Sequence, residues 1–223
     1  MKTYNLTVKT DHPVAYESPD HIMPWGTKRD NSTNLDFIRE VLQEYLEHFL
    51  DVKNNPNVLD LGCSGGQMVM DFVNHHCLAV GLEGSDYSVV HQRANWPEYY
   101  NKHLFTADVT KPYSVYNRDE RVYFDLITAW ELVEHIAPTD IEVLLEQISD
   151  NLKPGGKFIA SVSTRPDVIE GVVLHQSVFP KEQWLNTILP PLCEKYNLEI
   201  HEYPYKHKVR QDGGSFHIML KKK

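Results

Sequence analysis

The sequence predicts an α/β protein with a doubly wound, mostly parallel sheet. Apolar runs of strand length alternate with amphipathic stretches, a glycine-rich loop follows the first run, and acidic residues end the next two. Alternation of this kind favours parallel strands that are covered by helices on both faces. In such sheets a ligand binds at the carboxyl ends of the strands.

The elements are expected in a regular order after an irregular start. The first residues carry Pro13, Pro19 and Pro24 without a clear period, so residues 1–33 are expected to form an arm or lid. Residues 34–223 are expected to form a single domain that begins with an amphipathic helix over 34–50.

Within that domain, strands and helices alternate. Strands are expected at 57–61, 78–83, 103–107, 123–129 and 157–163, and helices at 66–76, 86–94 and 138–152. The last apolar runs, 198–209 and 215–220, flank "RQDGG" and predict an antiparallel hairpin. The hairpin would complete a seven-stranded sheet whose last strand is antiparallel.

The composition excludes several classes of protein. Twenty-two basic and 31 acidic residues give a net charge of −9, which disfavours nucleic acid as a partner. The apolar runs are too short to span a membrane, and the first twenty residues are too polar for a signal peptide. We therefore expect a cytoplasmic protein without a membrane partner. Cys63, Cys77 and Cys193 lack metal-type spacing.

The loop "VLDLGCSGG" places Gly62, Gly65 and Gly66 between the first strand and its helix. Glycine lets a ligand approach the backbone closely. A dinucleotide fingerprint would require glycine where Ser64 and Gln67 stand, and no Lys-Ser/Thr pair of a P-loop follows. The loop alone therefore leaves two interpretations open, a ligand site of another kind or a tight turn without a ligand.

Carboxylates end the next two strands. Glu83 ends the second strand, where it could accept hydrogen bonds from both hydroxyls of a ribose. Asp108 ends the third, where it could accept one from an adenine amino group. Either residue alone could equally cap a helix. Together with the glycine loop, their order fits a nucleoside ligand that lacks a pyrophosphate.

These blocks resemble the class I S-adenosylmethionine-dependent methyltransferases. The resemblance covers roughly residues 34–221 and depends on "VLDLGCSGG", Glu83, "ADV", "FDLITAWELVEHI" and "LKPGGKFIAS". It implies the Rossmann-like methyltransferase fold and S-adenosylmethionine as cofactor. The implied contacts run from the methionine part at the glycine loop, through the ribose at Glu83, to the adenine at Asp108. The full set of expected cofactor-binding residues is Trp25, Thr27, Asp60, Gly62, Cys63, Gly65, Gly66, Glu83, Gly84, Ser85, Asp108, Val109, Ala129 and Trp130.

The segment "WELVEHI" follows the fourth strand and holds Glu131, Glu134 and His135, which would share one face of a helical turn. They are either polar residues at a helix start or ligands of a divalent metal such as Mg²⁺ or Mn²⁺. His175, after the fifth strand, offers a further ligand. The pattern is similar to that of metal-dependent O-methyltransferases acting on the terminal ribose of small RNAs, and a related one occurs in ubiquinone biosynthesis. The resemblance implies Glu131, Glu134, His135 and His175 as metal ligands.

The substrates of those families share vicinal hydroxyl groups, so we expect an O-methyltransferase that acts on such a pair, on a sugar or glycan in the first place. A bound cation would lower the pKa of a hydroxyl, with His135 and Glu134 as the catalytic residues. Without a metal, His135 or His175 would act as a general base. The alternatives are a metal-independent O- or N-methyltransferase of small molecules and a non-catalytic cofactor-binding module. A nicotinamide enzyme is disfavoured by the glycine spacing.

Overall fold

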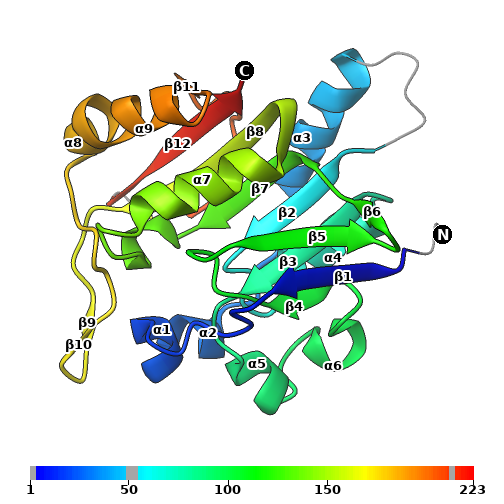
Figure 1. Ribbon diagram of the computed structural model, residues 1–223, viewed down its shortest axis with the longest axis horizontal. Helices are drawn as coiled ribbons and strands as arrows, with labels where there is room; N and C mark the ends of the chain where they lie inside the picture. The colour runs from blue at the N-terminus through cyan, green and yellow to red at the C-terminus, as the bar shows by residue number, and fades with distance from the viewer. Residues whose placement is uncertain (1–3, 49–54, 211–213) are drawn as a thin grey trace.

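The computed structural model describes residues 4–48, 55–210 and 214–223. Its main sheet has seven strands in the order β11-β12-β8-β7-β2-β3-β4 (Figure 1). Strands β8, β7, β2, β3 and β4 pair in parallel, and β12 pairs antiparallel with β8 and β11. The predicted doubly wound sheet with an antiparallel last strand is therefore confirmed.

The strands and helices of this sheet follow the predicted order with small shifts at most ends, but α5 ends at Val90 and β11 ends at His201, so residues 202–209 of the predicted hairpin are not strand. The strands are β2 Asn57–Leu61, β3 Leu78–Glu83, β4 Leu104–Thr106, β7 Phe124–Trp130, β8 Leu152–Ser163, β11 Leu198–His201 and β12 Ser215–Lys222. The helices are α3 Leu35–His48, α4 Gln67–Asn74, α5 Tyr87–Val90, α6 Trp96–Tyr99, α7 Ile141–Asn151, α8 Lys181–Gln183, the π-helix η2 Trp184–Ile188 and α9 Leu189–Lys195. Residues 49 and 50 of the first predicted helix and residues 211–213 of the predicted turn lie outside the described part of the chain.

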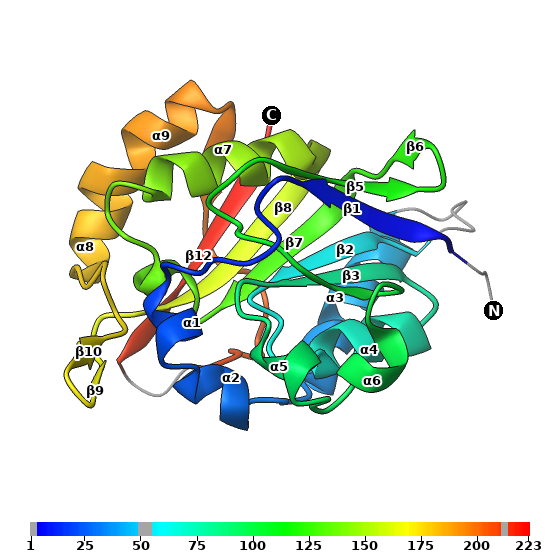
Figure 2. The ribbon, with the colours of Figure 1, turned by 60° about the horizontal axis from the view of Figure 1, so that its bottom comes forward.

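The sheet separates two hydrophobic cores because side chains along a strand alternate between its faces. On β2, Leu59 belongs to the core that contains α7 and α9, whereas its neighbour Val58 belongs to the core that contains α3 and α4. The same alternation divides Ile127 from Leu126 on β7. Figure 2 shows the helices on opposite sides of the sheet. The central strands are buried on both faces, which explains their continuous apolar runs.

A second sheet was not predicted. It consists of β1 Leu6–Thr10, β5 Tyr113–Asn117 and β6 Glu120–Arg121, all antiparallel. Leu6 and Val115 join the core on the α7 side, so this sheet covers part of the same face. The arm thus contributes a strand, followed by the short helices α1 Pro19–Ile22 and α2 Trp25–Arg29.

The segment between α7 and α8 differs from the prediction in two places. The residues "LKPGG" were expected to turn from a helix into a strand, but β8 already begins at Leu152. Its pairing with β7 shifts register between Phe124 and Leu126, which accommodates Gly155 at φ 78°. Between β8 and α8, residues Val168–Ile169 (β9) and Val172–Val173 (β10) form a small hairpin. None of the helices within the described ranges is long and apolar enough to cross a membrane.

Candidate functional site

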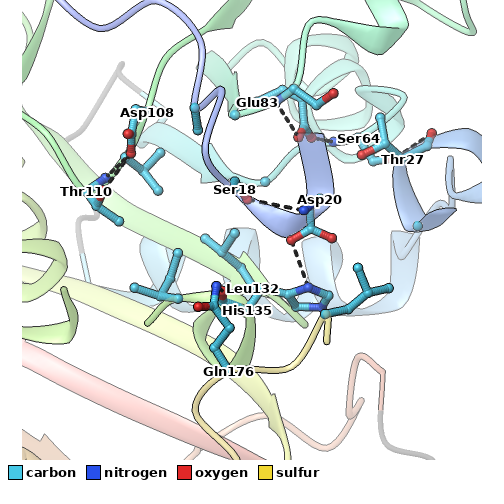
Figure 3. A pocket seen from close by; sticks show the side chains of 18 of the residues that line it. Ser18, Asp20, Thr27, Ser64, Glu83, Asp108, Thr110, Leu132, His135 and Gln176 are labelled. Carbon is cyan, nitrogen blue, oxygen red and sulfur yellow. Dashed lines mark hydrogen bonds and ion pairs between the residues drawn. The ribbon is translucent and has the colours of Figure 1, made fainter. Parts of the chain in front are cut away.

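A cavity of about 680 Å³ lies at the carboxyl ends of the parallel strands, within the size range of small-molecule sites. It is lined by the loops that follow β2, β3, β4 and β7 and by residues of the arm, including α1 and α2. Figure 3 shows residues from these separate segments around one space, with Asp20 between Glu83 and His135. The cavity therefore occupies the place where this fold class binds ligands.

Most of the expected cofactor-binding residues line this cavity. They are Trp25, Thr27, Gly62, Glu83, Gly84, Ser85, Asp108, Val109 and Trp130. The cavity lining does not include the others, which are Asp60, Cys63, Gly65, Gly66 and Ala129. Cys63 and Ala129 are buried in the two cores. Ser64, which was not predicted, lines the cavity as well.

The glycine loop turns sharply because two of its glycines adopt left-handed backbone conformations. Gly62 has φ 68° and Gly66 has φ 81°, a region that glycine occupies without steric cost. The side chain of Asn31 lies against Gly65, where an added Cβ would come within 2.2 Å of the Asn31 Oδ1 atom. That oxygen accepts a hydrogen bond from the Gln67 amide at the start of α4. The arm thus covers part of the loop.

Glu83 lies at the end of β3 with a carboxylate that is 6% exposed. Its two oxygens accept hydrogen bonds from the backbone amides of Ser64 (2.7 Å) and Ser85 (3.3 Å). Burial raises the pKa of Glu83 to about 7, although these hydrogen bonds oppose the shift. The carboxylate is held rigidly at the cavity wall, and each oxygen keeps a lone pair for a further donor.

Asp108 lies across the cavity from Glu83 (Figure 3). Its Oδ1 atom accepts hydrogen bonds from the amide (2.9 Å) and hydroxyl (2.6 Å) of Thr110. The Asp108 amide donates to the carbonyl of His12 in the arm (2.9 Å). Glu83 and Asp108 therefore present carboxylates at two separated points of one cavity, as a ligand with a ribose and a base would need.

Asp60 is 3% exposed and is not part of the cavity lining. It accepts a hydrogen bond from the Thr128 hydroxyl at 2.7 Å. Burial raises the pKa of Asp60 to about 7, assisted by the nearby charge of Glu83. A carboxyl group with a raised pKa binds a proton more tightly in the folded state than in the unfolded state.

The free energy of unfolding is therefore expected to fall as the pH rises from about 5 to 8. The stabilisation that protonated Asp60 contributes is fully present below the unfolded-state pKa near 4. It decreases as the pH rises and is lost once Asp60 ionises in the folded protein, around pH 7. Asp60→Asn should raise stability at pH 8 by about 2–4 kcal/mol and reduce this slope. Urea unfolding of both proteins at pH 5, 7 and 8 measures the free energy of unfolding and its slope with pH. Asp36→Asn, on the exposed face of α3, should leave the slope unchanged, and an equal loss at every pH in Asp60→Asn would contradict the assignment.

The segment "WELVEHI" does not form the expected helical face. Glu131 follows β7 with a left-handed φ of 51°, and Val133–His135 form the short 3₁₀-helix η1. Glu131 therefore lies outside the helical turn that carries Glu134 and His135, although its charge raises the pKa of both. Its Oε2 atom faces the Ser215 hydroxyl at 3.3 Å.

Glu134, His135 and His175 come together instead. Each offers a ligand atom, and these atoms lie within 4.8 Å of one another. The His135 and His175 rings meet edge to face, with centroids 4.6 Å apart. Of the four residues predicted as metal ligands, the structure thus groups three among the residues it describes, without Glu131.

The donor set fits a divalent cation. Glu134 is fully buried, and its Oε1 atom accepts a hydrogen bond from the Ser163 amide (3.0 Å). Its Oε2 atom is buried without a hydrogen-bond partner among the described residues. An unpaired buried carboxylate oxygen is costly, and a cation beside two imidazoles would satisfy it. Burial, reinforced by the charge of Glu131, raises the pKa of Glu134 to about 8.

Backbone and side-chain contacts fix the cluster. The His175 Nδ1–H group donates to the Arg165 carbonyl at 2.6 Å, which leaves Nε2 with a free lone pair. The amides of Gln176 and Ser177 both donate to the Glu134 carbonyl. The segment that carries His175 is therefore fastened to η1.

Asp20 lines the cavity and contacts His135, and the sequence did not indicate it as a site residue. Its Oδ2 atom lies 2.8 Å from the His135 Nδ1 atom, and it reaches across from α1. Burial favours a neutral His135, but Asp20, Glu134 and Glu131 outweigh burial and raise the pKa of His135. The only sequence sign of this helix was Ser18-Pro19, a pattern typical of a helix start.

Comparison with known proteins identifies the family of this chain. A family model described as a methyltransferase domain matches residues 34–207. The ubiquinone biosynthesis O-methyltransferase of Coxiella burnetii is 27% identical over 146 residues, which cover 66% of this chain and 59% of that protein. The enzyme of the same name from Nitrobacter winogradskyi is 28% identical over 143 residues, which cover 61% of this chain and 51% of that protein. The chain thus spans little more than half the length of these relatives.

Solved structures share the fold. The amino pentose methyltransferase of Micromonospora echinaspora, bound to S-adenosylmethionine, matches with a TM-score of 0.56 and 13% identity, over 90% of this chain and 95% of that one. The magnesium protoporphyrin IX methyltransferase of Synechocystis, bound to S-adenosylhomocysteine, matches with a TM-score of 0.55 and 12% identity, over 92% and 96%. Since the family model covers most of the chain, this protein belongs to the methyltransferase domain family, and it has the fold of the class I S-adenosylmethionine-dependent methyltransferases.

Proposed function

We propose that this enzyme methylates a hydroxyl oxygen of a small acceptor with vicinal hydroxyls, such as a sugar, with the help of a divalent cation. The observation that carries the proposal is the cluster of Glu134, His135 and His175, whose ligand atoms lie within 4.8 Å of one another. His135 also lines the cavity. A metal-binding group would therefore adjoin the space where the cofactor and the acceptor meet.

The chain's own residues have distinct roles in this proposal. Glu83 and Asp108 hold the nucleoside half of the cofactor, and the buried Glu134 with His135 and His175 holds Mg²⁺ or Mn²⁺. A divalent cation supplies Lewis acidity that lowers the pKa of a hydroxyl group. The arm excludes water from the cavity. Catalysis would then consist mainly of aligning the hydroxyl with the methyl group and removing its proton.

Two observations support an oxygen acceptor with several hydroxyl groups. The relatives from Coxiella burnetii and Nitrobacter winogradskyi are named O-methyltransferases. The cavity wall near His135 carries Glu131, Asp140, Asp167 and Gln176, which are hydrogen-bonding groups suited to hydroxyls. An extended apolar acceptor would leave these polar groups unpaired, at a cost in affinity.

One observation favours a second candidate, methylation without a metal. The 2.8 Å contact between Asp20 and His135 resembles the carboxylate–imidazole pair of many general bases. In that case His135 itself would remove the hydroxyl proton. The two candidates use the same acceptor and cofactor, and they differ in their response to metal.

Turnover of S-adenosylmethionine to S-adenosylhomocysteine tests both. The enzyme is treated with EDTA and offered a methyl glycoside with vicinal hydroxyls, its monodeoxy analogue or catechol, with and without Mg²⁺ or Mn²⁺. We expect turnover of the glycoside to fall about 100-fold without metal and to return on its addition, and the deoxy analogue to react poorly. Turnover that is insensitive to EDTA would favour the general base, and turnover of catechol alone would contradict the sugar. Product on neither diol would contradict hydroxyl methylation.

A further inference from the structure

The arm reaches the acceptor side of the cavity through one side chain. Asp20 extends from α1 to His135, with 2.8 Å between Oδ2 and Nδ1 (Figure 3). The two side chains are 25% and 15% exposed, so the contact is largely shielded from solvent. The family match begins only at residue 34, and Asp20 therefore lies outside the part of the chain that the family shares.

Contacts of the arm with its own helix α1 and with the loop after Glu83 fix the position of Asp20. Ser18 caps α1 by accepting a hydrogen bond from the Asp20 amide at 3.3 Å, and Pro19 presets the first helical turn. The Ala15 amide donates to the carbonyl of Gly84, directly after Glu83, at 2.9 Å. The charge of Asp20 also contributes to the raised pKa of Glu83. Asp20 thus lies close to both Glu83 and His135.

A carboxylate beside one imidazole nitrogen determines what the other nitrogen can do. The 2.8 Å separation is that of an ion pair, and a carboxylate at this distance favours a hydrogen on the His135 Nδ1 atom, because an ionised carboxylate only accepts hydrogen bonds. In the neutral ring, the lone pair then resides on Nε2. The ring of His175 packs edge to face against His135, which restricts rotation of the ring. The carboxylate and the second imidazole together define one orientation and one tautomer.

We propose that Asp20 is a positioning residue that holds His135 with its Nε2 lone pair toward the reaction centre. The inference rests on the proposed function, in which His135 acts through a ring nitrogen as ligand or base. In this proposal the arm lines the cavity and also orients His135 through Asp20. Partners of this kind typically change metal affinity or activity by 10–100-fold when they are removed.

Three variants test the proposal. Asp20→Ala removes the acceptor at Nδ1, and Asp20→Asn keeps an amide oxygen that can accept the same hydrogen bond. Asp86→Asn is the matched control, because Asp86 makes the other ion pair of α1, with His21 at 3.8 Å, and does not touch His135. We expect kcat to fall about 10–100-fold in Asp20→Ala, to recover in large part in Asp20→Asn, and to stay unchanged in Asp86→Asn. The Kd of S-adenosylhomocysteine, from calorimetry, should change less than about twofold.

A second measurement is independent of activity. ¹⁵N NMR of the histidine-labelled protein at pH 9, with His135 assigned from the spectrum of His135→Gln, reports the tautomer of the neutral ring. We expect an Nδ1–H tautomer in the wild type and a mixture in Asp20→Ala. An Nε2–H wild-type ring, or an Nδ1–H ring that persists in Asp20→Ala, would overturn the proposal. So would weaker S-adenosylhomocysteine binding with an unchanged kcat, which would mean that Asp20 only anchors the arm. Failure of the wild type to methylate any hydroxyl would instead contradict the proposed function.

Discussion

Glu134→Gln is expected to lower turnover by about 100-fold or more and to leave the Kd of S-adenosylhomocysteine almost unchanged. Glu134 is fully buried, and its Oε2 atom has no hydrogen-bond partner among the described residues. The substitution exchanges the carboxyl group, which can ionise when it binds a cation, for an amide group that binds cations poorly. Glu134 does not line the cavity wall, so the contacts of the cofactor should persist.

The glutamine variant separates chemistry from folding. Its amide oxygen can still accept the hydrogen bond from Ser163 that Oε1 accepts at 3.0 Å, whereas Glu134→Ala would leave both a cavity and an unpaired amide. Glu142→Gln is the control, since it removes an exposed carboxylate that pairs with Lys195 and should keep full activity.

Binding of Mn²⁺, followed by electron paramagnetic resonance, provides a readout apart from activity and should weaken at least about 10-fold in Glu134→Gln. Retained turnover would contradict the role of the carboxylate. Lost turnover with unchanged Mn²⁺ binding would contradict the role of this residue as a ligand.

The central sheet could be predicted because its signals are local. Each of β2, β3 and β7 is a mainly apolar run bounded by turn residues, as expected for strands buried on both faces. The ligand-binding edge followed from the topology, since Glu83 and Asp108 both end parallel strands. Those carboxylates do line one cavity, although their contacts with the cofactor remain predictions.

Other features depend on pairings between distant parts of the chain. Leu6 and Val8 alternate with polar residues, a strand signal that the nearby prolines obscured, and their partners lie on β5, more than one hundred residues away. The contact of Asp20 with His135 is of the same kind. A period in the sequence reports which face of an element is apolar, but it does not report which distant residue will lie opposite.

The geometry of the metal motif could not be predicted from residue spacing alone. Its spacing was interpreted with helical geometry, and a single backbone angle changed the outcome. Glu131 adopts φ 51°, so it does not continue the 3₁₀-helix that carries Glu134 and His135, although its charge still acts on both. Non-glycine residues enter this region only when the surrounding structure stabilises it, and no local pattern in "WELVEHI" indicates that.

Glu83→Gln is expected to weaken cofactor binding by about 10–100-fold, because a ribose hydroxyl gains roughly 1.5–3 kcal/mol from a charged acceptor. The carboxylate of Glu83 is oriented by the amides of Ser64 and Ser85, and in the glutamine variant one of these amides would face an NH₂ group. Calorimetry with S-adenosylhomocysteine measures the change. Glu98→Gln, an exposed carboxylate on α6, is the control and should bind normally.

The pH dependence of binding makes this prediction specific to the charge. Since burial raises the pKa of Glu83 to about 7, the free protein carries a protonated Glu83 below that pH. A ribose that donates to the ionised carboxylate must then displace a proton. Wild-type affinity should therefore be complete above about pH 8 and fall as the pH decreases through 7, approaching about tenfold per pH unit. The glutamine variant should lack this decrease, and a variant that keeps both the affinity and the slope of the wild type would exclude Glu83 from the cofactor site.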